Sequence, residues 1–271
     1  MRARLVGLAA TADAAANREA AVQAVRDAAA DGLDLVVLPE FAGGFDPRGV
    51  GRELAEPLDG PFVGALRAAS AGITTIAGTV VPAADDRAVN VVVAVRDGVL
   101  LGSYAKVHLY DAFGQRESDL LVPGPPDVAP LVLDVAGLRV GVMTCYDLRF
   151  PESARRLVDA GAEAIAVPAA WAGSAANREL KSDHWRTLLR ARAIENTVWT
   201  FGVPMRGAGV VGDLLAVDPL GEVVAEAAPA PGVRGPRLVD AVDVSADPAV
   251  VAEVRVTNPS LANRRYTVVP R

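Results

Sequence analysis

The sequence predicts an α/β fold in which mixed β-sheets are flanked by helices. Short apolar segments, many of them β-branched and bounded by Gly, Pro, Asn or Asp, recur along the chain and are typical of strands. Segments with helical periodicity alternate with them early and return late, as expected of helices that cover a sheet. Hairpin signals such as Asp97-Gly98 interrupt this alternation. Because a purely parallel sheet does not need hairpins, we expect mixed sheets in one domain spanning residues 1–271.

The expected strands are apolar runs that end at turn-forming residues. In chain order they are Arg4–Ala9, Leu35–Leu38, Thr74–Val80, Asn90–Arg96, Val99–Tyr104, Leu131–Val135, Arg139–Met143, Ala164–Pro168, Val198–Val203, Val210–Val217, Glu222–Ala225 and Leu238–Val244. Further turns are expected at 134–137 and 218–221, where Asp and Gly occur together. The stretch 227–236, rich in Ala, Pro and Gly, is expected to be a surface loop.

Four segments carry apolar residues at helical spacing. They are Asn17–Ala30, Pro61–Ala71, Pro151–Ala160 and Leu180–Asn196. Pro61 and Pro151 each stand where a helix tolerates a proline in its first turn. No internal repeat or low-complexity linker divides the chain, which favours a single domain.

The composition excludes several classes of function. A net charge of −6 and a pI near 5.1 argue against a nucleic-acid or anionic-membrane partner, since no basic stripe is available to neutralise phosphates. The sequence contains no run of about 18 apolar residues, so no membrane span is predicted. The apolar segment Leu5–Ala10 is too short to be the core of a signal peptide. Two histidines and one cysteine are too few for a conventional zinc site. We expect a cytoplasmic protein with a reduced thiol.

Cys145 is the only cysteine in the 271 residues, and it follows the expected strand Arg139–Met143. A polar turn comes next, and Pro151-Glu152 opens a helix. Exposed N–H groups and the positive end of a helix dipole at such a place favour a thiolate. The alternative is a small buried apolar residue, which is the commoner role of a lone cysteine. Cys145 is a candidate nucleophile if other residues supply a base and a charge stabiliser.

Charged residues also stand at the ends of other apolar strands. Glu40 directly follows Leu35-Val-Val-Leu-Pro, where partial burial suits a carboxylate to accept a proton; the alternative is a solvated loop glutamate. Lys106 is either a solvent-facing residue that protects a sheet edge or a cation that stabilises an oxyanion in a pocket. Glu117 follows in a polar loop, where a surface position is the alternative.

A glutamate, a lysine and a cysteine together suffice for one chemistry. The carboxylate takes the thiol proton, and the sulfur attacks an electrophilic carbon bonded to nitrogen. The cation stabilises the tetrahedral oxyanion, ammonia or an amine leaves, and water hydrolyses the resulting thioester. No histidine is required.

Three motifs in this order resemble the nitrilase (carbon–nitrogen hydrolase) superfamily. They are Leu-Pro-Glu40-Phe, Tyr-Ala-Lys106-Val-His-Leu and Met-Thr-Cys145-Tyr-Asp-Leu-Arg-Phe-Pro-Glu. Further resemblances lie in Asp31-Gly-Leu-Asp-Leu, at Asn90, in Pro168-Ala-Ala-Trp171, in His184-Trp, in Arg190–Asn196, in Asp218–Glu222 and in Arg264-Arg-Tyr266. The resemblance therefore spans essentially the whole chain.

The resemblance implies a fold and a set of roles. The fold is an α-β-β-α sandwich, usually paired into a homodimer or higher homo-oligomer. Glu40 is then the general base, Lys106 the oxyanion stabiliser and Cys145 the nucleophile. Glu117 matches a second family glutamate that orients the lysine and the substrate nitrogen, and the backbone N–H of Tyr146 completes the oxyanion hole. No metal or organic cofactor is implied.

The run after Cys145 most resembles the omega-amidase-like branches, which act on small amides of dicarboxylic acids. Arg149 is a candidate for binding a substrate carboxylate; the alternative is a structural salt bridge to Asp147 or Glu152. Trp171 is a candidate for lining the pocket, with core packing as the alternative.

Four other residues are secondary candidates for the pocket. Trp185 is a second possible aromatic lining residue, and core packing is again the alternative. His108 and His184 are more typical of hydrogen-bonded structural residues than of catalysts. Asp213 stands where many members of the family have a glycine-x-serine, so a carboxylate there is expected to change what the pocket accepts.

Other functions are compatible with the same residues. N-carbamoyl amino acid hydrolysis and nitrile hydrolysis use the same three catalytic groups. A catalytically silent binding protein on this fold is expected to have lost one of them, whereas this chain keeps all three. A redox-sensing thiol is disfavoured because the chain has no second, resolving cysteine. An amidohydrolase for small amides is the function that the sequence favours.

Overall fold

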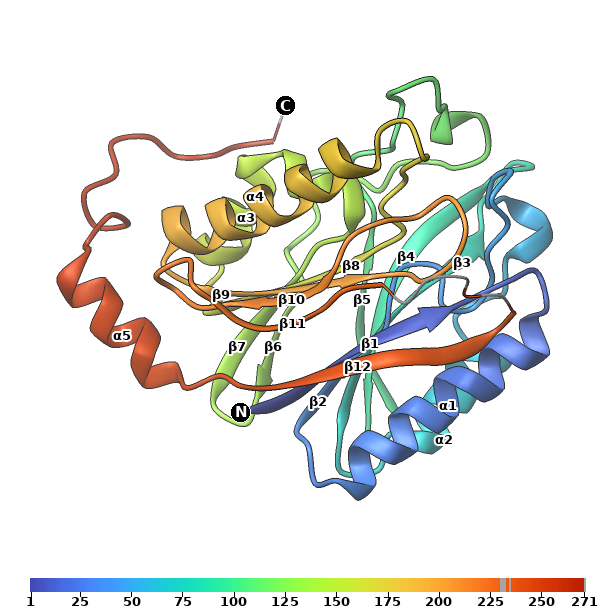
Figure 1. Cartoon of the computed structure of the whole chain (residues 1–271), viewed down its shortest axis with the longest axis horizontal. Helices are drawn as coiled ribbons and strands as arrows, with labels where there is room; N and C mark the ends of the chain where they lie inside the picture. Colours follow the sequence, from blue (N-terminus) through green and yellow to red (C-terminus); the bar gives the residue numbers. More distant parts are fainter. Residues whose placement is uncertain (230–232, 234, 271) are drawn as a thin grey trace.

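A computed structural model describes residues 1–229, 233 and 235–270. In these residues the strands form two sheets of six (Figure 1). The first sheet has the order β12-β1-β2-β3-β4-β5, and the second has the order β11-β10-β9-β8-β7-β6. The first comprises β1 (Arg2–Ala9), β2 (Leu35–Val37), β3 (Thr74–Pro82), β4 (Ala88–Arg96), β5 (Val99–Ala105) and β12 (Arg237–Ser245). The second comprises β6 (Val132–Val135), β7 (Leu138–Val142), β8 (Ala164–Ala169), β9 (Trp199–Pro204), β10 (Leu214–Val217) and β11 (Val223–Ala227).

Both sheets are mixed, as predicted. Strands β1, β2 and β3 pair in parallel, as do β7, β8 and β9, while β4, β5, β6, β10, β11 and β12 pair antiparallel with their neighbours. The expected hairpin turn at Asp97-Gly98 joins β4 to β5, and both residues have positive φ, of 49° and 78°. Each sheet thus has a parallel centre with antiparallel strands at its sides.

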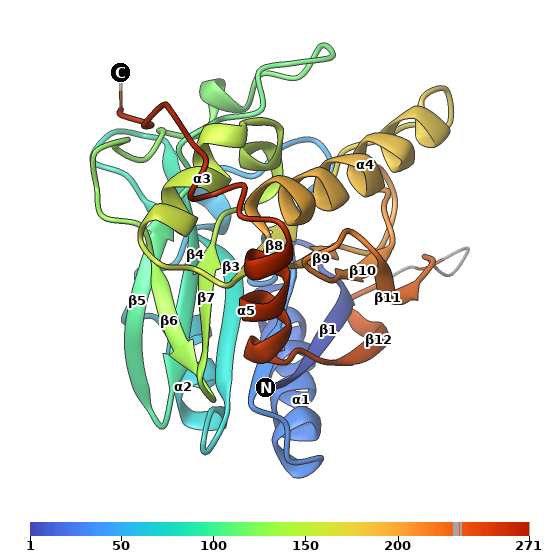
Figure 2. The same ribbon diagram turned by 90° about the vertical axis from the view of Figure 1, so that its left-hand side faces the viewer.

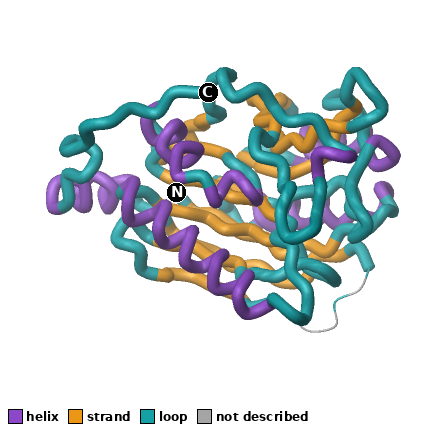
Figure 3. The backbone as a smooth tube through the Cα atoms, turned by 90° about the horizontal axis from the view of Figure 1, so that it is seen from above, coloured by secondary structure: helices purple, strands orange, loops and turns teal. Residues whose placement is uncertain are grey.

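Helices cover the outer face of each sheet and complete four layers (Figures 1 and 2). Helices α1 (Ala14–Ala30) and α2 (Pro61–Ala69) lie on the first sheet, and α3 (Pro151–Asp159) and α4 (Arg178–Asn196) lie on the second. In the view from above, strands occupy the middle of the molecule and helices flank them (Figure 3). The predicted α-β-β-α sandwich is confirmed.

Three apolar cores hold these layers together. One lies between the two sheets, and each of the others lies between a sheet and its helices. In β1, Leu5 packs into the core between the sheets, while its neighbour Val6 packs toward α1. Because the central strands are buried on both faces, they read as continuous apolar runs rather than as an alternation.

In the later part of the chain one expected strand is shorter than predicted and one helix was missed. The strand expected at Val210–Val217 begins only at Leu214, because Gly212 has a φ of 107° that no strand accommodates. Helix α5 (Pro248–Thr257) was not predicted, although Asp247 caps its first turn and Pro248 follows at its first position. Its four valines gave it the composition of a strand. The loop expected at 227–236 falls partly on residues outside the described ones.

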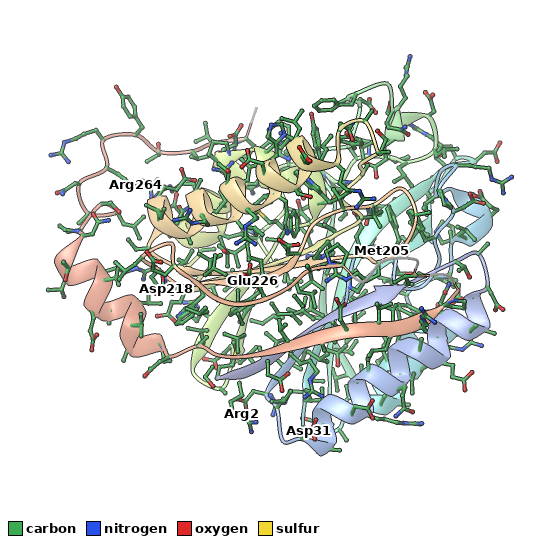
Figure 4. The ribbon with its side chains drawn as sticks, viewed as in Figure 1. Arg2, Asp31, Met205, Asp218, Glu226 and Arg264 are labelled. Atoms are coloured by element: carbon green, nitrogen blue, oxygen red, sulfur yellow. The ribbon has the colours of Figure 1, made fainter. Side chains whose placement is uncertain are left out.

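The segment after α5 returns along the second sheet toward α3 (Figures 2 and 4). Arg264, labelled in Figure 4, forms an ion pair with Asp159 at the end of α3. Among the described residues, no helix has the length and apolarity that crossing a bilayer requires.

Gly78 of β3 is the position where the fold most directly constrains Glu40. A Cβ built on Gly78 would lie 2.5 Å from the Glu40 Cα and 2.8 Å from the Phe41 backbone nitrogen. We expect Gly78→Ala to lower the free energy of unfolding by about 1–3 kcal/mol, since these backbone atoms must shift, and to lower catalytic activity as well. Urea denaturation and an amide hydrolysis assay measure the two effects.

Gly64 of α2 provides a matched control, because it is exposed and a Cβ there meets nothing within 4 Å. Gly64→Ala is expected to leave activity unchanged and to raise stability by up to about 1 kcal/mol, from helix propensity alone. Equal behaviour of the two variants would contradict the proposed constraint on Glu40.

Candidate active site

Three strand ends bring the predicted catalytic residues together. Glu40 follows β2, Lys106 follows β5 and Cys145 follows β7, and all three line one cavity of about 380 Å³. Glu117, from the loop after β5, lines the same cavity. The strand that ends at Lys106 belongs to the first sheet and the strand before Cys145 to the second, so the site lies between the two sheets.

Glu40 is fully buried and has no free acceptor facing solvent. Its Oε1 accepts hydrogen bonds from Asn90 Nδ2 at 2.6 Å and from Lys106 Nζ at 3.0 Å. Its Oε2 accepts one from the Ala170 backbone N–H at 2.6 Å. These bonds hold the carboxylate in one orientation beside the Cys145 thiol.

Lys106 lies between two carboxylates. Its Nζ donates to both oxygens of Glu117, at 2.9 and 2.8 Å, and to Glu40 at 3.0 Å, while the side chain is 1% exposed. Burial alone would lower the pKa of Lys106, but the Glu117 and Glu40 carboxylates raise it well above its usual range. Lys106 therefore remains a fixed cation at the floor of the cavity, which is the state that oxyanion stabilisation needs.

Glu117 is held from both sides. Its Oε2 accepts a hydrogen bond from the Tyr110 backbone N–H at 2.6 Å in addition to those from Lys106. Burial raises the pKa of Glu117 against the opposing effect of Lys106. The surface position that was the alternative for Glu117 is excluded.

Cys145 begins a short 3₁₀ helix, Cys145–Arg149, with a positive φ of 48°. Such a backbone conformation is unfavourable for a residue with a Cβ and is common at functional sites. The side chain is buried, with 6% of the residue exposed to the cavity. The expectation of a stabilised thiolate was wrong: burial and the Glu40 carboxylate raise the pKa of the Cys145 thiol well above its usual range, and Lys106 only partly opposes them. The resting residue is a thiol with a carboxylate next to it.

A buried aspartate fastens the nucleophile turn to the lysine strand. Asp147 accepts hydrogen bonds from the Thr144 backbone N–H at 3.1 Å and from the Tyr104 hydroxyl at 2.8 Å. It also contacts His108 through the backbone N–H at 3.1 Å and through Nδ1 at 2.7 Å. Since Tyr104 and His108 flank Lys106, Asp147 sets the position of Lys106 relative to Cys145.

The predicted substrate-binding residues line the same cavity as the catalytic ones. Tyr146, Arg149 and Trp171 all line it. The Arg149 guanidinium lies over the Trp171 ring, with its Cζ 5.0 Å from the ring centroid, and its Nη2 lies 3.2 Å from His184 Nδ1. Among the described residues, no carboxylate pairs with Arg149, so the salt bridge to Asp147 or Glu152 is not formed. Its buried Nε also has no hydrogen-bond partner.

Several secondary candidates do not reach the cavity. Asp213 instead pairs with Arg186 at 2.8 Å, so the expected effect of its carboxylate on the pocket was wrong. Trp185 is fully buried in the core and donates its Nε1–H to the Asp213 carbonyl at 2.9 Å. His108 and His184 hold Asp147 and Arg149 in place from behind the lining, as expected of structural residues.

Sequence reasoning gave no role in the site to four of its residues, although it noted Asn90 as a point of resemblance to the family. Asn90, a fully buried amide inside β4, holds Glu40, and its position within an apolar run was a usable signal. Tyr110, Phe113 and Lys181 line the same cavity as Cys145. The two aromatic residues lie in an irregular loop, and Lys181 lies near the start of α4, so neither the periodicity nor a strand end marked them.

Comparisons with known proteins agree with this geometry. A model of the carbon–nitrogen hydrolase family matches residues 2–233. Deaminated glutathione amidase of Escherichia coli O157:H7 is 37% identical over 254 residues, which make up 92% of this chain and 92% of that protein. Hydrolase Rv0480c of Mycobacterium tuberculosis is 36% identical and covers 99% of this chain and 94% of its own.

Solved structures share the fold. XC1258 of Xanthomonas campestris, a CN-hydrolase superfamily protein with an arsenic adduct in its active site, aligns with a TM-score of 0.80 at 27% identity, over 100% of this chain and 99% of that one. A glutamate-to-glutamine mutant of the Nesterenkonia sp. AN1 amidase, which shows Michael addition of acrylamide at its active-site cysteine, aligns with a TM-score of 0.74 at 26% identity, over 95% and 97% of the two chains.

The sandwich fold, the buried single cysteine and the similarity across the chain lead to one assignment. The chain belongs to the carbon–nitrogen hydrolase family of the nitrilase superfamily and is an amidase-type hydrolase.

Proposed function

We propose that this enzyme hydrolyses a small, carboxylate-bearing amide through a thioester on Cys145. The observation that carries the proposal is the convergence of Glu40, Lys106 and Cys145, from three strand ends, on one cavity. A base, a fixed cation and a nucleophile are the three groups that the reaction needs.

In the first half of the reaction, Glu40 takes the proton of the thiol as the sulfur attacks the amide carbon. The thiol is protonated at rest, so proton transfer accompanies attack rather than preceding it. The negative charge that develops on the carbonyl oxygen is stabilised by Lys106 and the backbone N–H of Tyr146. The carbon–nitrogen bond then breaks, Glu40 returns the proton to the leaving nitrogen, and ammonia or an amine departs.

In the second half, water replaces the amine. Glu40 takes a proton from the water, whose oxygen attacks the thioester carbon and releases the carboxylic acid and the Cys145 sulfur. The proton on Glu40 returns to the sulfur, so the enzyme is regenerated. Glu117 keeps Lys106 aligned throughout through its two hydrogen bonds.

The proposed substrate class follows from Arg149 and Trp171, which line the cavity. Arg149 is a cation without a carboxylate partner in the described chain, stacked on Trp171, and is suited to bind the carboxylate of an omega-amide. The Escherichia coli relative is named deaminated glutathione amidase, so deaminated glutathione is the first compound to test. An ammonia- and amine-release screen over omega-amides, deaminated glutathione, N-carbamoyl amino acids and nitriles distinguishes the alternatives that share the catalytic residues.

Removal of the nucleophile is expected to abolish turnover. Cys145→Ala should lower kcat for the best amide by roughly 10⁴- to 10⁶-fold, as for other enzymes that lose a nucleophile, while circular dichroism remains that of the native protein. Glu40→Gln should lower kcat by about 10²- to 10⁴-fold, because no group then accepts the thiol proton. Full activity of either folded variant would rule out the mechanism.

The pKa of the thiol offers a second test, because replacing Glu40 should make Cys145 easier to alkylate but less active in amide hydrolysis. The Glu40 carboxylate raises the pKa of Cys145, so Glu40→Gln should move the midpoint of alkylation by iodoacetamide to lower pH while amide hydrolysis falls. Intact-protein mass spectrometry after timed quenching measures the alkylation. Glu152→Gln, which alters an exposed carboxylate at the start of α3, is the control and should not move the midpoint. A midpoint that stays in place or rises in Glu40→Gln would contradict the assigned electrostatics.

A further inference from the structure

The chain contains two lysines among its 27 basic residues, and both lie in the same cavity. One is Lys106, and the other is Lys181 near the start of α4, which is 2% exposed. Arginine serves every other basic position, on the surface as well as in buried ion pairs. Because the chain otherwise uses arginine, even on its surface, the lysine at position 181 calls for a specific explanation.

Lys181 is an ammonium group without an anionic partner. Its Nζ donates to the Tyr110 hydroxyl at 2.6 Å and lies 3.6 Å from the centroid of the Phe113 ring. No carboxylate within the described residues pairs with it. It also stands close to the amino-terminal end of a helix, where the helix dipole disfavours a cation.

A second unpaired cation lies on the same aromatic ring. The Arg149 Cζ is 5.9 Å from the Phe113 centroid, so both positive groups border one small volume beside the nucleophile. Burial, the nearby Arg149 and the opposing effect of Cys145 together lower the pKa of Lys181 to about 8. A buried cation next to a second, half-buried one is unfavourable unless an anion is placed between them.

We propose that Lys181 is a specificity-determining residue that, together with Arg149 and the Tyr110 hydroxyl, binds the carboxylate of the substrate. The proposal rests on the amidase function above and adds to Arg149 a second cation that selects its substrate: through Lys181, amides whose acyl chain ends in a carboxylate are preferred over neutral amides of the same length. Phe113 and Trp171 form the apolar sides of this subsite: the Lys181 Nζ lies over the ring of Phe113, and the Arg149 guanidinium lies over the ring of the buried Trp171.

The subsite has a defined pH dependence. Lys181 carries its charge below its pKa of about 8 and loses it above, so the affinity for a carboxylate falls as the pH rises through that value. The groups that face Lys181 are Tyr110, Arg149 and Cys145. Burial raises the pKa of Tyr110 to about 12, so its hydroxyl stays neutral near pH 8. The pKa of the Cys145 thiol is raised well above its usual range.

Protection of Cys145 from alkylation tests the subsite without relying on turnover. Cys145 is the only cysteine, so the rate of iodoacetamide labelling reports one residue. Succinate should slow labelling of the native protein at pH 7, and the concentration that gives half protection should rise about 10- to 100-fold in Lys181→Gln, the loss expected for one charged hydrogen bond. Lys181→Arg should restore protection and extend it above pH 9, where the native protein loses it. Arg178→Gln, an exposed cation one turn away on α4, is the matched control and should change nothing.

Kinetics with succinamate and butyramide complete the test. Lys181→Gln should raise KM for succinamate with little change in kcat and leave butyramide unaffected. If succinate protects the Gln variant as well as the native protein, or if Lys181→Arg does not restore protection, the inference is overturned while the amidase function stands. If succinate protects as expected but no ammonia is released from any amide, the proposed function fails and the anion subsite remains.

Discussion

The ammonium group of Lys106, held between the carboxylates of Glu40 and Glu117, is the interaction on which the site depends. Lys106 and Glu40 are buried and the Glu117 side chain is only 16% exposed, so a loss of the cation would leave two poorly solvated like charges close together. Glu40 follows β2, Lys106 follows β5 and Glu117 lies in the connection after β5, so the ion cluster also holds these segments in place. Gly78 of β3 lets the backbone of Glu40 approach closely enough for the cluster to form.

The same cluster explains why the nucleophile rests as a thiol. Glu40 raises the pKa of Cys145, as burial does, and Lys106 opposes them only in part because its charge is already shared by two carboxylates. Proton transfer from sulfur to Glu40 removes one of those negative charges, after which Lys106 can stabilise the sulfur and the developing oxyanion. The arrangement keeps the sulfur protonated, and therefore less nucleophilic, in the resting enzyme. The cations Arg149 and Lys181, which line the same cavity, favour substrates that bring a negative charge.

Much of this architecture could be predicted because the apolar pattern of each segment matches the burial of that segment in the folded chain. Doubly buried strands such as β2 appear as apolar runs, and a charged residue directly after such a run, as with Glu40, marks the mouth of a site. Lys181 could not be predicted, since it is an ordinary helix residue whose significance comes from the loop folded against it. Asp213 was misjudged because sequence position alone does not reveal its ion pair with Arg186. The expectation of a thiolate failed for a related reason. The helix-dipole argument used only residues next to Cys145 in the sequence, whereas burial and the distant Glu40 carboxylate, which raise the pKa of the thiol, depend on the tertiary structure.

The most direct measurement of the central claim is the mass of the enzyme during turnover of a slowly hydrolysed amide, quenched in acid and analysed intact and as peptides. The account predicts an increase equal to the mass of the amide minus that of the departing ammonia or amine, located on the peptide that contains Cys145 and absent from Cys145→Ala. Turnover with no such adduct, or with the acyl group on another residue, would contradict it.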